Sequence, residues 1–423
     1  MSGICALYST KDKDAINIIS VGLYALQHRG QEGVGIVTID DNKVYEVKRR
    51  GLLSEISDKD AIYGVKGNKG IAIAKYAFGH NTKFEPVMPY VYNHKNGNIA
   101  VAIDGNIANK DFYISELIEK VNGPEKELVE YVKKLEGSFT VVLISDEKMV
   151  VIRDKYGIKP ICIGRIGDDF IASSETAMLD SVGASFVKDL ENGEIYIAGK
   201  NGQKSIKTVE KDSNLCLFEM IYIARPDSSI DGISVYKSRF KMGEKLFEES
   251  PTKADIVIGA PDSGLIAAKG YASASGLPYV DGLIKNRYIG RTFIKPTQDE
   301  RLKGVHLKLN PIKENIEGKE VILVDDSIVR GTTIRRTIEI LKRAGAKKIH
   351  VKIACPQIKY SEKMSIDIPD EKDLISYGKT IEEVRQEINA DSLYFLSLDA
   401  LEDACGNKGY YEKYFTGKSP IKE

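Results

Sequence analysis

Val321-Ile-Leu-Val-Asp-Asp-Ser-Ile-Val-Arg-Gly-Thr-Thr333 is the stretch that decides the fold of this chain. Its first four residues are apolar and have the length and composition of a buried parallel strand. Directly after it, apolar residues recur at helical spacing at Ile334, Ile338 and Leu341, and Gly345 stands where a helix would end. The stretch therefore predicts a strand, a loop and a helix in succession.

The predicted loop carries groups that suit phosphate and metal. The strand ends on two adjacent carboxylates, Asp325 and Asp326, and hydroxyl side chains follow them. Backbone N–H groups at a helix N-terminus attract anions, and Gly331 would let this backbone approach a ligand closely. Such a site suits a ligand with both hydroxyls and phosphate, or a Mg²⁺ ion that the ligand carries. The simpler alternative is an ordinary loop with a solvated pair of aspartates.

Composition excludes several other classes of protein. The 423 residues suffice for two domains, and the 61 basic residues balance the 61 acidic ones, so no overall field favours nucleic acid or an anionic membrane. No apolar run approaches the length of a membrane-spanning helix, and the N-terminus does not resemble a signal peptide. The five cysteines are scattered and form no CxxC pair. We therefore expect a reduced, cytoplasmic protein that binds neither nucleic acid nor membrane.

The pattern of elements changes near the middle of the chain. The first half consists mainly of short strands and turns, whereas the second half alternates strands and helices, as parallel α/β sheets do. We place the boundary in the charged stretch around residues 200–214, which gives domains 1–210 and 211–423. In the first half the expected strands are Gly33–Ile39, Ile71–Ala77, Asn98–Ile103, Phe139–Ile144, Met149–Arg153 and Glu194–Ile197, and the expected helices are Asp14–Gln27, Phe112–Lys120 and Pro124–Leu135. In the second half the expected order is strand Ala254–Gly259, helix Ser263–Ser275, strand Val321–Val324, helix Thr333–Ala344 and strand Lys348–Ala354, with tail helices at Lys379–Ile388 and Ser392–Ala404.

A second loop supports the phosphate site. The predicted strand at Ala254–Gly259 leads into Pro-Asp-Ser-Gly, where Asp262, Ser263 and Gly264 precede a helix and would offer N–H groups and a hydroxyl to pyrophosphate or its metal. Between the two loops lies a basic segment, Lys285–Asn310, without strong periodicity. Taken alone it would be a solvated loop. Its place between two phosphate-type loops favours a mobile lid that supplies cations to departing pyrophosphate and excludes water.

These motifs resemble those of the type I phosphoribosyltransferases, which use phosphoribosyl pyrophosphate (PRPP). The segments Cys216–Ser228, Asp231–Tyr236, Gly282–Thr297 and Val321–Thr333 together resemble the glutamine PRPP amidophosphoribosyltransferases, which make 5-phosphoribosylamine in the first committed step of purine synthesis. The resemblance implies an α+β domain, an αββα sandwich of the N-terminal-nucleophile (Ntn) hydrolase type, followed by an α/β phosphoribosyltransferase domain with a doubly wound parallel sheet. It also implies Mg²⁺ as the cofactor and PRPP as the substrate, with purine nucleotides as candidate inhibitors. The expected assembly is a homo-oligomer, or a hetero-oligomer with an active homologue.

The same resemblance assigns roles in the transferase half. PRPP would be bound by the residues of the two loops, namely Asp262, Ser263, Gly264, Asp325, Asp326, Ser327, Arg330, Gly331, Thr332 and Thr333. Mg²⁺ would be held by Ser263, Asp325 and Asp326. Lys285, Asn286 and Arg287 would act in the lid, and Tyr222 would lie near the passage for ammonia.

The glutaminase half keeps the family's outline but departs from it at the nucleophile. Motifs at Gly22–Glu32, Asp104–Asn106, Arg153–Pro160 and Ser173–Thr176 fall in the family's order. The family has a cysteine after the initiator methionine, whereas this chain has Ser2, which is small enough to permit removal of Met1. A serine hydroxyl needs much stronger activation than a thiol, although serine does serve as the nucleophile in related hydrolases.

Two further positions weaken the amide chemistry. Lys75 replaces an arginine that would clamp the glutamine carboxylate, a bidentate role that lysine fills poorly. Asp104, before Gly105, replaces the amide that donates to the oxyanion, and losing one such donor costs about 3 kcal/mol. The stretch 106–137 is short and lacks the family's Ser-Asp-x-Glu, and Cys5 is too far along the chain to replace the nucleophile. We therefore expect glutamine hydrolysis to be lost.

Some members of the family hold an iron–sulfur cluster on four cysteines. Only Cys216 matches these positions, and Glu362, Tyr411 and Tyr414 stand at the other three. Because one cysteine cannot hold such a cluster, we expect none.

The leading hypothesis combines intact PRPP chemistry with degraded amide chemistry. It is an amidophosphoribosyltransferase that uses free ammonia, or ammonia from a separate glutaminase. The alternative is a non-catalytic PRPP-binding regulatory or scaffold paralogue that partners an active homologue. The basic residues of the lid favour the enzyme, because a protein that only binds PRPP would not need them.

Overall fold

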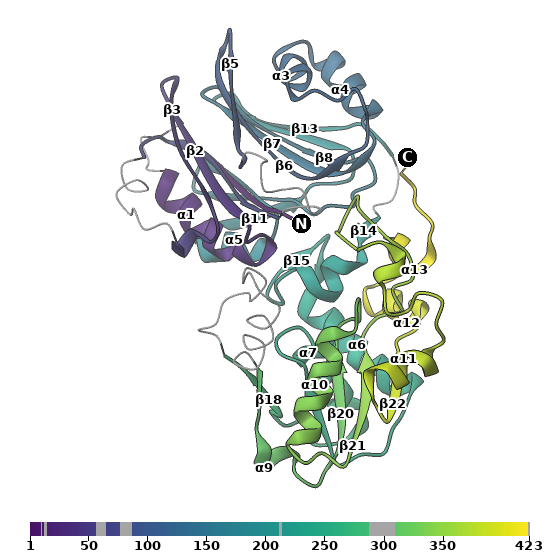
Figure 1. Ribbon diagram of the computed structural model, residues 1–423. Coiled ribbons are helices and arrows are strands. Elements are labelled where there is room, and N and C mark those ends of the chain that lie inside the picture. Colours follow the sequence, from purple (N-terminus) through teal and green to yellow (C-terminus); the bar gives the residue numbers. More distant parts are fainter. Residues whose placement is uncertain are drawn as a thin grey trace.

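The computed structural model describes residues 1–9, 11, 15–55, 65–76, 87–210, 214–286 and 309–421. In this part of the chain two halves lie one above the other, and both β-rich layers belong to the N-terminal half (Figure 1). The parallel sheet with its helices forms the other half, and the C-terminus runs back beside the N-terminal half (Figure 1).

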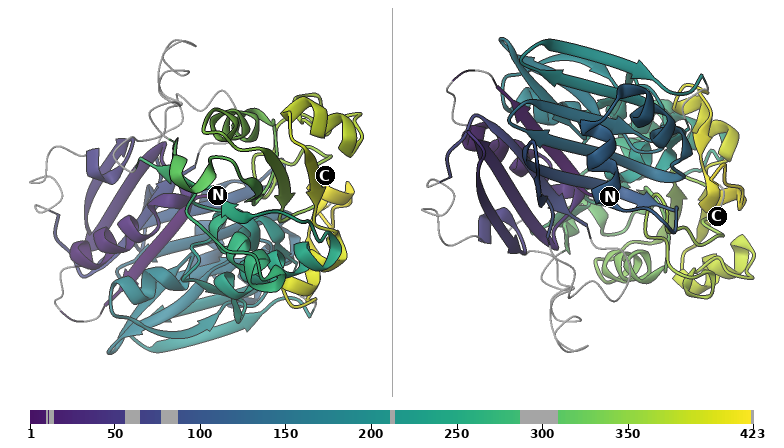
Figure 2. Two further views of the ribbon diagram at one scale, coloured as in Figure 1. Left: turned by 90° about the horizontal axis from the view of Figure 1, so that it is seen from below. Right: turned by 90° about the horizontal axis from the view of Figure 1, so that it is seen from above.

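The N-terminal half is a sandwich of two antiparallel sheets. The first sheet has the order β11 (Ser185–Asp189), β9 (Cys162–Ile166), β10 (Asp169–Ser173), β1 (Gly3–Tyr8), β4 (Lys69–Lys75), β2 (Gly33–Asp40) and β3 (Lys43–Arg50). The second has the order β13 (Gly202–Lys207), β12 (Glu194–Gly199), β8 (Lys148–Arg153), β7 (Gly137–Ser145), β6 (Gly97–Ile107) and β5 (Tyr90–His94). The two sheets are seen stacked in both views of Figure 2.

Strand β1 shows why the sandwich forms. Side chains of a strand alternate between its two faces. Ile4, Ala6 and Tyr8 therefore pack between the two sheets, while Cys5 and Leu7 pack on the opposite face. Helices α1 (Ala15–Ala25) and α5 (Thr176–Ser181) share that outer core with Cys5 and Leu7.

The second sheet is covered in the same way on its own outer face. Helices α3 (Ile114–Asn122) and α4 (Glu125–Lys134) contribute Leu117, Leu128 and Val132 to a core with β6, β7 and β8. The layers are thus helix, sheet, sheet, helix, and the predicted αββα sandwich is confirmed.

The C-terminal half is built on a parallel sheet. Its order is β17 (Ile256–Gly259), β20 (Glu320–Asp325), β21 (Lys348–Ile353) and β22 (Ser392–Phe395), and every neighbouring pair is parallel. Among the described residues of this half, the helices are α6 (Val235–Glu249), α7 (Leu265–Ser275), α9 (Lys313–Ile316), α10 (Thr332–Arg343), α11 (Ile381–Ile388), α12 (Leu398–Ala404) and α13 (Lys413–Thr416). The predicted strand and helix around Val321–Thr333 are both present as β20 and α10.

Small elements complete the described chain. Two-stranded pairs are formed by β14 (Leu215–Cys216) with β23 (Tyr410–Tyr411), β15 (Ser229–Ile230) with β16 (Ile233–Ser234), and β18 (Leu283–Lys285) with β19 (Leu309–Pro311). The short helices are η1 (Gln27–Arg29), η2 (Leu53–Glu55) and η6 (Glu371–Asp373), all 3₁₀, and the π-helical turn η4 (Glu219–Ile223).

The prediction of a single helix over Ser392–Ala404 is wrong. Residues Ser392–Phe395 instead form β22, which adds to the edge of the parallel sheet beside β21. The helix α12 begins only after Ser397, whose side chain accepts a hydrogen bond from the N–H of Ala400 as an N-cap. The stretch 200–214 is likewise not all linker, because β13 lies within it.

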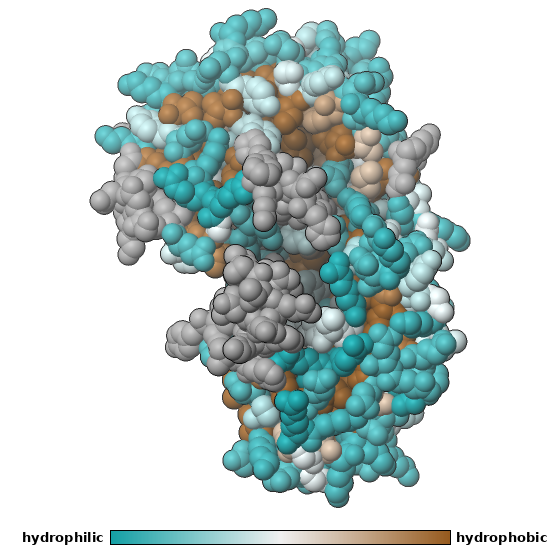
Figure 3. Space-filling view, in the orientation of Figure 1, coloured by the Kyte–Doolittle hydropathy of each residue, from teal (hydrophilic) through white to brown (hydrophobic). Residues whose placement is uncertain are grey.

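The surface agrees with the balanced composition. The face in Figure 3 is largely hydrophilic, with hydrophobic side chains visible mainly over the N-terminal sandwich and near the parallel sheet. Among the described residues, no helix is both long enough and apolar enough to cross a membrane.

Candidate active sites

The acidic-pair loop, Asp325–Thr333, joins β20 to α10. Asp325 and Asp326 are 9% and 7% exposed, and the N–H of Asp326 donates to Asp325 Oδ1 at 2.9 Å. Ser327 Oγ donates to Asp326 Oδ2 at 2.6 Å. The two carboxylates are thus held side by side at the carboxyl end of the sheet, where ligands of open parallel sheets bind.

The Asp-Ser-Gly loop, Asp262–Gly264, lies directly beside this pair. Parallel pairing aligns Gly259 of β17 with Val324 of β20, so the loops that follow both strands emerge at the same edge. Ser263 Oγ donates to Asp326 Oδ1 at 2.6 Å. A Cβ on Gly264 would lie 2.4 Å from the carbonyl oxygen of Val324, so only glycine fits this close approach. The fold therefore joins the two loops that the sequence singled out.

The start of α10 is shaped for an anion. Gly331 has φ +74° and precedes Thr332, and a Cβ at this position would lie 2.2 Å from Ile375 Cδ1. Thr332 and Thr333 are exposed, so their hydroxyl and N–H groups can face a ligand. Arg330 is about half exposed and lies 3.8 Å from Asp373.

Burial opposes the ionisation of Asp325 in the acidic pair. Removal from water, together with the neighbouring carboxylate of Asp326, raises the pKa of Asp325 well above its ordinary value. A divalent cation would displace the retained proton and neutralise both groups. Two carboxylates beside hydroxyl oxygens are hard ligands of the kind that Mg²⁺ takes together with phosphate oxygens, so the residues present fit this ion.

The predicted lid residues lie only partly within the described chain. Lys285 Nζ donates to a carboxylate oxygen of Asp262, which places the lysine beside the Asp-Ser-Gly loop. Lys285 also pairs with Leu309 across β18 and β19, so residues 285 and 309 are neighbours. Asn286 is the next described residue, whereas Arg287 lies outside the described residues. Tyr222 lies on η4 and is 45% exposed.

The N-terminal residues form a second, fully enclosed cluster. Ser2 is 3% exposed, and its Oγ accepts a hydrogen bond from the N–H of Tyr76 at 3.1 Å. Lys75, directly before Tyr76, ends β4 and is 8% exposed. The N–H of Ser2 donates to Asp104 Oδ1 at 2.5 Å, and the amine of Met1 lies 3.2 Å from the same oxygen. The positions that the sequence marked as degenerate therefore do meet.

Asp104 is an ionised carboxylate in this cluster. Burial opposes its ionisation, but Lys159, the N-terminal amine and Arg29 outweigh burial and lower the pKa of Asp104 to about 2. Its Oδ2 lies 3.9 Å from both Arg29 Nη2 and Lys159 Nζ. Gly105 follows with φ +95°, where a Cβ would lie 2.0 Å from the carbonyl oxygen of Ser138. Such a site presents negative charge to the backbone N–H of Ser2.

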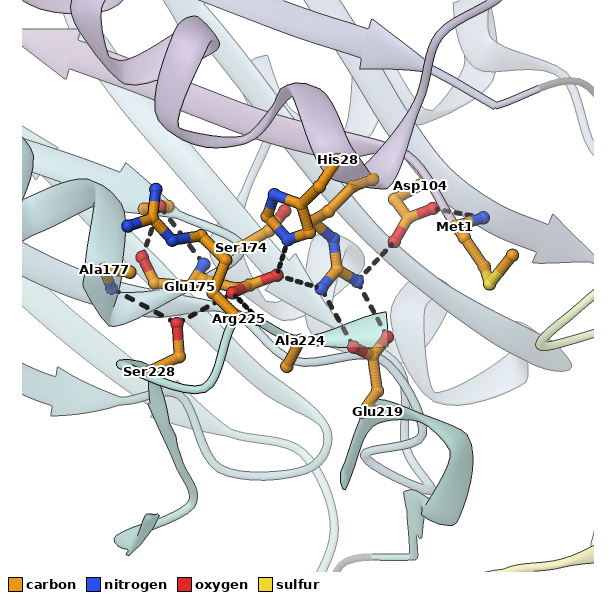
Figure 4. Close-up of polar contacts among 12 residues, drawn as sticks. Met1, His28, Asp104, Ser174, Glu175, Ala177, Glu219, Ala224, Arg225 and Ser228 are labelled. Atoms are coloured by element: carbon orange, nitrogen blue, oxygen red, sulfur yellow. Dashed lines mark hydrogen bonds and ion pairs between the residues drawn. The ribbon is translucent and has the colours of Figure 1, made fainter. Parts of the chain in front are cut away.

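Sequence reasoning missed the buried ions around this cluster. Arg29 bonds to Glu175 Oε1 at 2.7 Å and to both oxygens of Glu219 at 2.9 and 2.7 Å. Figure 4 shows the carboxylates of Asp104, Glu175 and Glu219 converging on this one guanidinium. Arg29, Lys159, Glu175 and Glu219 all lie within segments that resemble the family, but the sequence assigned none of them a role.

The four positions that match cluster ligands in the family also converge. Tyr411 donates to Glu362 Oε1 at 2.9 Å, and Cys216 Sγ lies 3.6 Å from the hydroxyl oxygen of Tyr414. Glu362 also accepts hydrogen bonds from the backbone N–H groups of residues 364–366. All four side chains are at most 1% exposed. In the described part of the chain, no group of three or more His, Cys, Asp or Glu side chains could hold a metal ion.

Each half of the chain matches a known protein family. Residues 237–386 match the phosphoribosyl transferase domain model, and residues 88–181 match a glutamine amidotransferase domain model. The amidophosphoribosyltransferase of Methanocaldococcus jannaschii is 39% identical, with 100% of this chain and 98% of that protein covered. The chain belongs to the amidophosphoribosyltransferase family.

Other members of the amidophosphoribosyltransferase family agree in sequence and in fold. The Bacillus subtilis amidophosphoribosyltransferase is 39% identical over 97% of this chain and 92% of its own length. A solved structure of the B. subtilis glutamine PRPP amidotransferase with ADP and GMP superimposes with a TM-score of 0.90, at 38% identity over 99% of this chain and 97% of that one. The predicted order, an Ntn-type glutamine amidotransferase fold followed by a type I phosphoribosyltransferase fold, is thereby confirmed, and the chain is an enzyme of this family.

Proposed function

We propose that this chain makes 5-phosphoribosylamine and pyrophosphate from PRPP, with ammonia rather than glutamine as its nitrogen source. The observation that carries the proposal is the contrast between the two sites. Ser263 of the Asp-Ser-Gly loop bonds to Asp326 of the acidic-pair loop, whereas the backbone N–H of Ser2 bonds to the ionised carboxylate of Asp104.

The transferase loops suit a PRPP molecule that spans them. Asp325 and Asp326 would bind the ribose hydroxyls and Mg²⁺, and Ser327, Arg330, Gly331, Thr332 and Thr333 would hold the 5-phosphate at the start of α10. Asp262, Ser263 and Gly264 would bind the pyrophosphate, with Ser263 also close to the metal. Mg²⁺, when bound, neutralises charge on the pyrophosphate.

The reaction needs a cation on the leaving group and a dry site. The nitrogen lone pair of ammonia forms a bond to ribose C1, the C1–O bond to pyrophosphate breaks, and the nitrogen then loses one proton. Lys285 is already beside the Asp-Ser-Gly loop, so its ammonium can turn from Asp262 to the departing pyrophosphate. We assign Asn286 and Arg287 to the same lid, and Tyr222 to the route of ammonia.

Hydrolysis of glutamine would need an oxyanion donor where Asp104 stands. An ionised carboxylate repels a developing oxyanion instead of stabilising it. Cys5 offers no replacement, because it donates to the carbonyl oxygen of Ile19 on the other face of β1, and burial raises its pKa to about 12. We therefore propose that this half has lost its glutaminase activity, together with any iron–sulfur cluster at Cys216.

The partners follow from the proposed reaction. They are PRPP, Mg²⁺ and ammonia in the cytoplasm, with purine nucleotides as inhibitors, by analogy with the B. subtilis enzyme that was solved with ADP and GMP. A homo-oligomer, or a hetero-oligomer with an active homologue, is the proposed assembly.

Pyrophosphate release tests the proposal directly. The full chain is incubated with PRPP, Mg²⁺ and ammonium at mildly alkaline pH, where more of the ammonium is free ammonia. Sustained release that rises with ammonium supports the transferase, whereas PRPP binding without turnover would establish a non-catalytic paralogue. In a parallel reaction with glutamine, formation of glutamate above background would refute the loss of the glutaminase.

A further inference from the structure

A buried ion network crosses between the two halves of the molecule. Arg29 ends η1 in the N-terminal half, and its guanidinium forms two parallel bonds with Glu219 of η4 in the C-terminal half. Both side chains are fully buried. Bidentate Arg–carboxylate pairs fix geometry as well as charge, so η4 is held in one orientation relative to the N-terminal half.

The network surrounds Arg29 with carboxylates from both halves, Asp104 and Glu175 from the N-terminal half and Glu219 from the C-terminal half. Lys159 and the N-terminal amine lie beside Asp104, and burial lowers the pKa of that amine to about 5, so the amine is largely neutral at neutral pH. Burial disfavours the charge on Arg29, but Glu219 and Glu175 raise its pKa above its usual range. Buried ion pairs of this kind contribute little net stability, because desolvation offsets their attraction, so their conformational effect is the more informative one.

The turn that Glu219 begins is anchored at its other end as well. Arg239 of α6 is 4% exposed, and its Nε donates to the carbonyl oxygen of Met220 at 2.7 Å. Its Nη2 donates to the carbonyl oxygen of Ala224 at 2.8 Å. The π-helical turn is therefore bonded to Arg29 of the N-terminal half and to Arg239 of the C-terminal half. Such turns are uncommon and occur often at functional sites.

Helix α6 in turn packs against α7, the helix that follows the Asp-Ser-Gly loop. A Cβ on Gly243 of α6 would lie 1.9 Å from the carbonyl oxygen of Ala267, and one on Gly270 of α7 would lie 1.9 Å from that of Phe240. The two helices thus touch through their backbones. Helix α7 begins directly after the Asp-Ser-Gly loop, whose Ser263 bonds to Asp326. Close-packed elements of this kind shift together.

We propose that Arg29 and Glu219 are positioning residues for the PRPP site. The N-terminal half, through this pair, sets the position of η4, α6 and α7, and with them the geometry of the Asp-Ser-Gly loop against Asp326. This role is independent of glutamine hydrolysis. It rests on the proposed function only in taking Mg²⁺-PRPP as the ligand of the two loops.

Binding of Mg²⁺-PRPP to the full-length protein tests the role without requiring turnover. Titration calorimetry compares wild type with Arg29→Gln, Glu219→Gln and the double variant, at a temperature where circular dichroism shows each to be folded. We expect each single change to weaken binding about 10-fold or more, since displacement of groups far from the ligand by about 1 Å carries penalties of this size. The double variant should lose less than the two single losses combined, because both changes break one interaction.

A second pair of the same kind provides a matched control. Arg153 of β8 also forms two bonds with a carboxylate of the other half, to Asp231 at 2.7 and 2.9 Å, and is 1% exposed. It does not contact η4 in these bonds. Arg153→Gln should lower thermal stability at least as much as Arg29→Gln does, because Arg153 also donates to the carbonyl oxygens of Gly157, Lys159 and Leu190, yet it should bind Mg²⁺-PRPP as wild type does.

The outcomes separate the two proposals. If folded Arg29→Gln and Glu219→Gln bind Mg²⁺-PRPP within about 2-fold of wild type, a change within RT of zero, the positioning role is refuted. Equal weakening by Arg153→Gln would also refute it, because the effect would then be general loosening. If wild type itself does not bind Mg²⁺-PRPP, the proposed function fails, and the positioning role fails with it. If wild type binds but does not turn over, only the transferase activity fails.

Discussion

Single carboxylates lie in opposite electrostatic surroundings in the two halves. Asp325 is destabilised as an anion by burial and by Asp326, whereas Asp104 is stabilised as an anion by Lys159, the N-terminal amine and Arg29. The first arrangement stores a proton that a divalent cation can displace, and the second keeps a permanent negative charge beside Ser2. Opposite surroundings thus give the same side chain opposite roles.

Asp325→Asn should weaken binding of Mg²⁺-PRPP without lowering the stability of the fold. Because the pKa of Asp325 is raised in the folded chain, the folded state retains a proton that the unfolded state loses near pH 4, so the stability of the free protein falls as pH rises through that window. The amide removes this penalty, and we expect the variant at pH 7 to be as stable as wild type or more stable by about 1 kcal/mol in urea unfolding.

The same variant should bind Mg²⁺-PRPP about 100-fold more weakly, a loss of about 3 kcal/mol for a charged partner. Calorimetry of wild type between pH 5 and pH 8 should also show Mg²⁺-PRPP binding that tightens as pH rises, because the metal competes with the proton of Asp325. A pH-independent affinity would contradict this assignment.

Restoring glutamine hydrolysis should require a change at Asp104 as well as a cysteine nucleophile at position 2. Ser2→Cys alone leaves the ionised Asp104 at the proposed oxyanion position, so glutamate formation should stay near background. Ser2→Cys with Asp104→Asn should exceed Ser2→Cys by about 100-fold or more, the value of one oxyanion donor. Mass spectrometry must show that Met1 is removed in both variants. Equal rates for the single and the double variant would show that Asp104 is not the obstacle.

At the scale of elements, the packing of α6 on α7 controls how the Asp-Ser-Gly loop is placed. The contact depends on two glycines that bring the helix backbones together, at Gly243 and Gly270. No flexible side chain lies in the path of an added Cβ, since carbonyl oxygens are the nearest atoms. The helices would have to move apart to accommodate it.

Gly270→Ala should therefore destabilise the protein despite the better helix propensity of alanine. Propensity favours alanine by about 1 kcal/mol, but overpacking against Phe240 should cost about 3 kcal/mol, for a net loss of about 2 kcal/mol. Urea unfolding measures this difference. Ser273→Ala, at an exposed position of the same helix, should change stability by less than about 0.5 kcal/mol. A neutral Gly270→Ala would show that α6 and α7 can separate without penalty.

At the scale of the whole molecule, hydrogen bonds of the C-terminal segment join the two halves. Tyr414 accepts a hydrogen bond from the N–H of Phe218 at 3.0 Å and donates to the carbonyl oxygen of Tyr411, while Glu362 orders the turn that ends at residue 366. That turn presents the carbonyl oxygen of Ser365 to Lys159, which faces Asp104 in the N-terminal half. Hydrogen bonds thus link the side chains at the positions where the family resemblance would place cluster ligands.

Metal analysis should show that the protein needs Mg²⁺ but not iron. Purified protein should contain no stoichiometric iron by elemental analysis, and exposure to air should leave its activity unchanged, because we expect no cluster that air could oxidise. EDTA should abolish pyrophosphate release, and excess Mg²⁺ should restore it fully. Bound iron at one or more equivalents per chain, or activity lost irreversibly in air, would contradict this prediction.

The sequence by itself determined the order of the two folds and the two phosphate-type loops. These follow from local patterns: the apolar run Val321–Val324, the acidic pair after it and the helical spacing from Ile334 are each legible within a few residues. The family resemblance also pointed to Ser2, Lys75 and Asp104 as positions that depart from the family's pattern. The error at Ser392–Ala404 arose because a short apolar segment can form a strand or a helix, and only the free edge of β21 favoured the strand.

Only the tertiary structure decided what surrounds each charge. The pairing of Arg29 with Glu219 joins residues 190 positions apart, and that of Ser263 with Asp326 joins residues 63 apart. Neither pairing leaves a periodic signal, because a buried ion depends on which distant backbone folds over it. The interaction energy between these charges also depends on burial. Burial is a property of the packed molecule and not of any short segment.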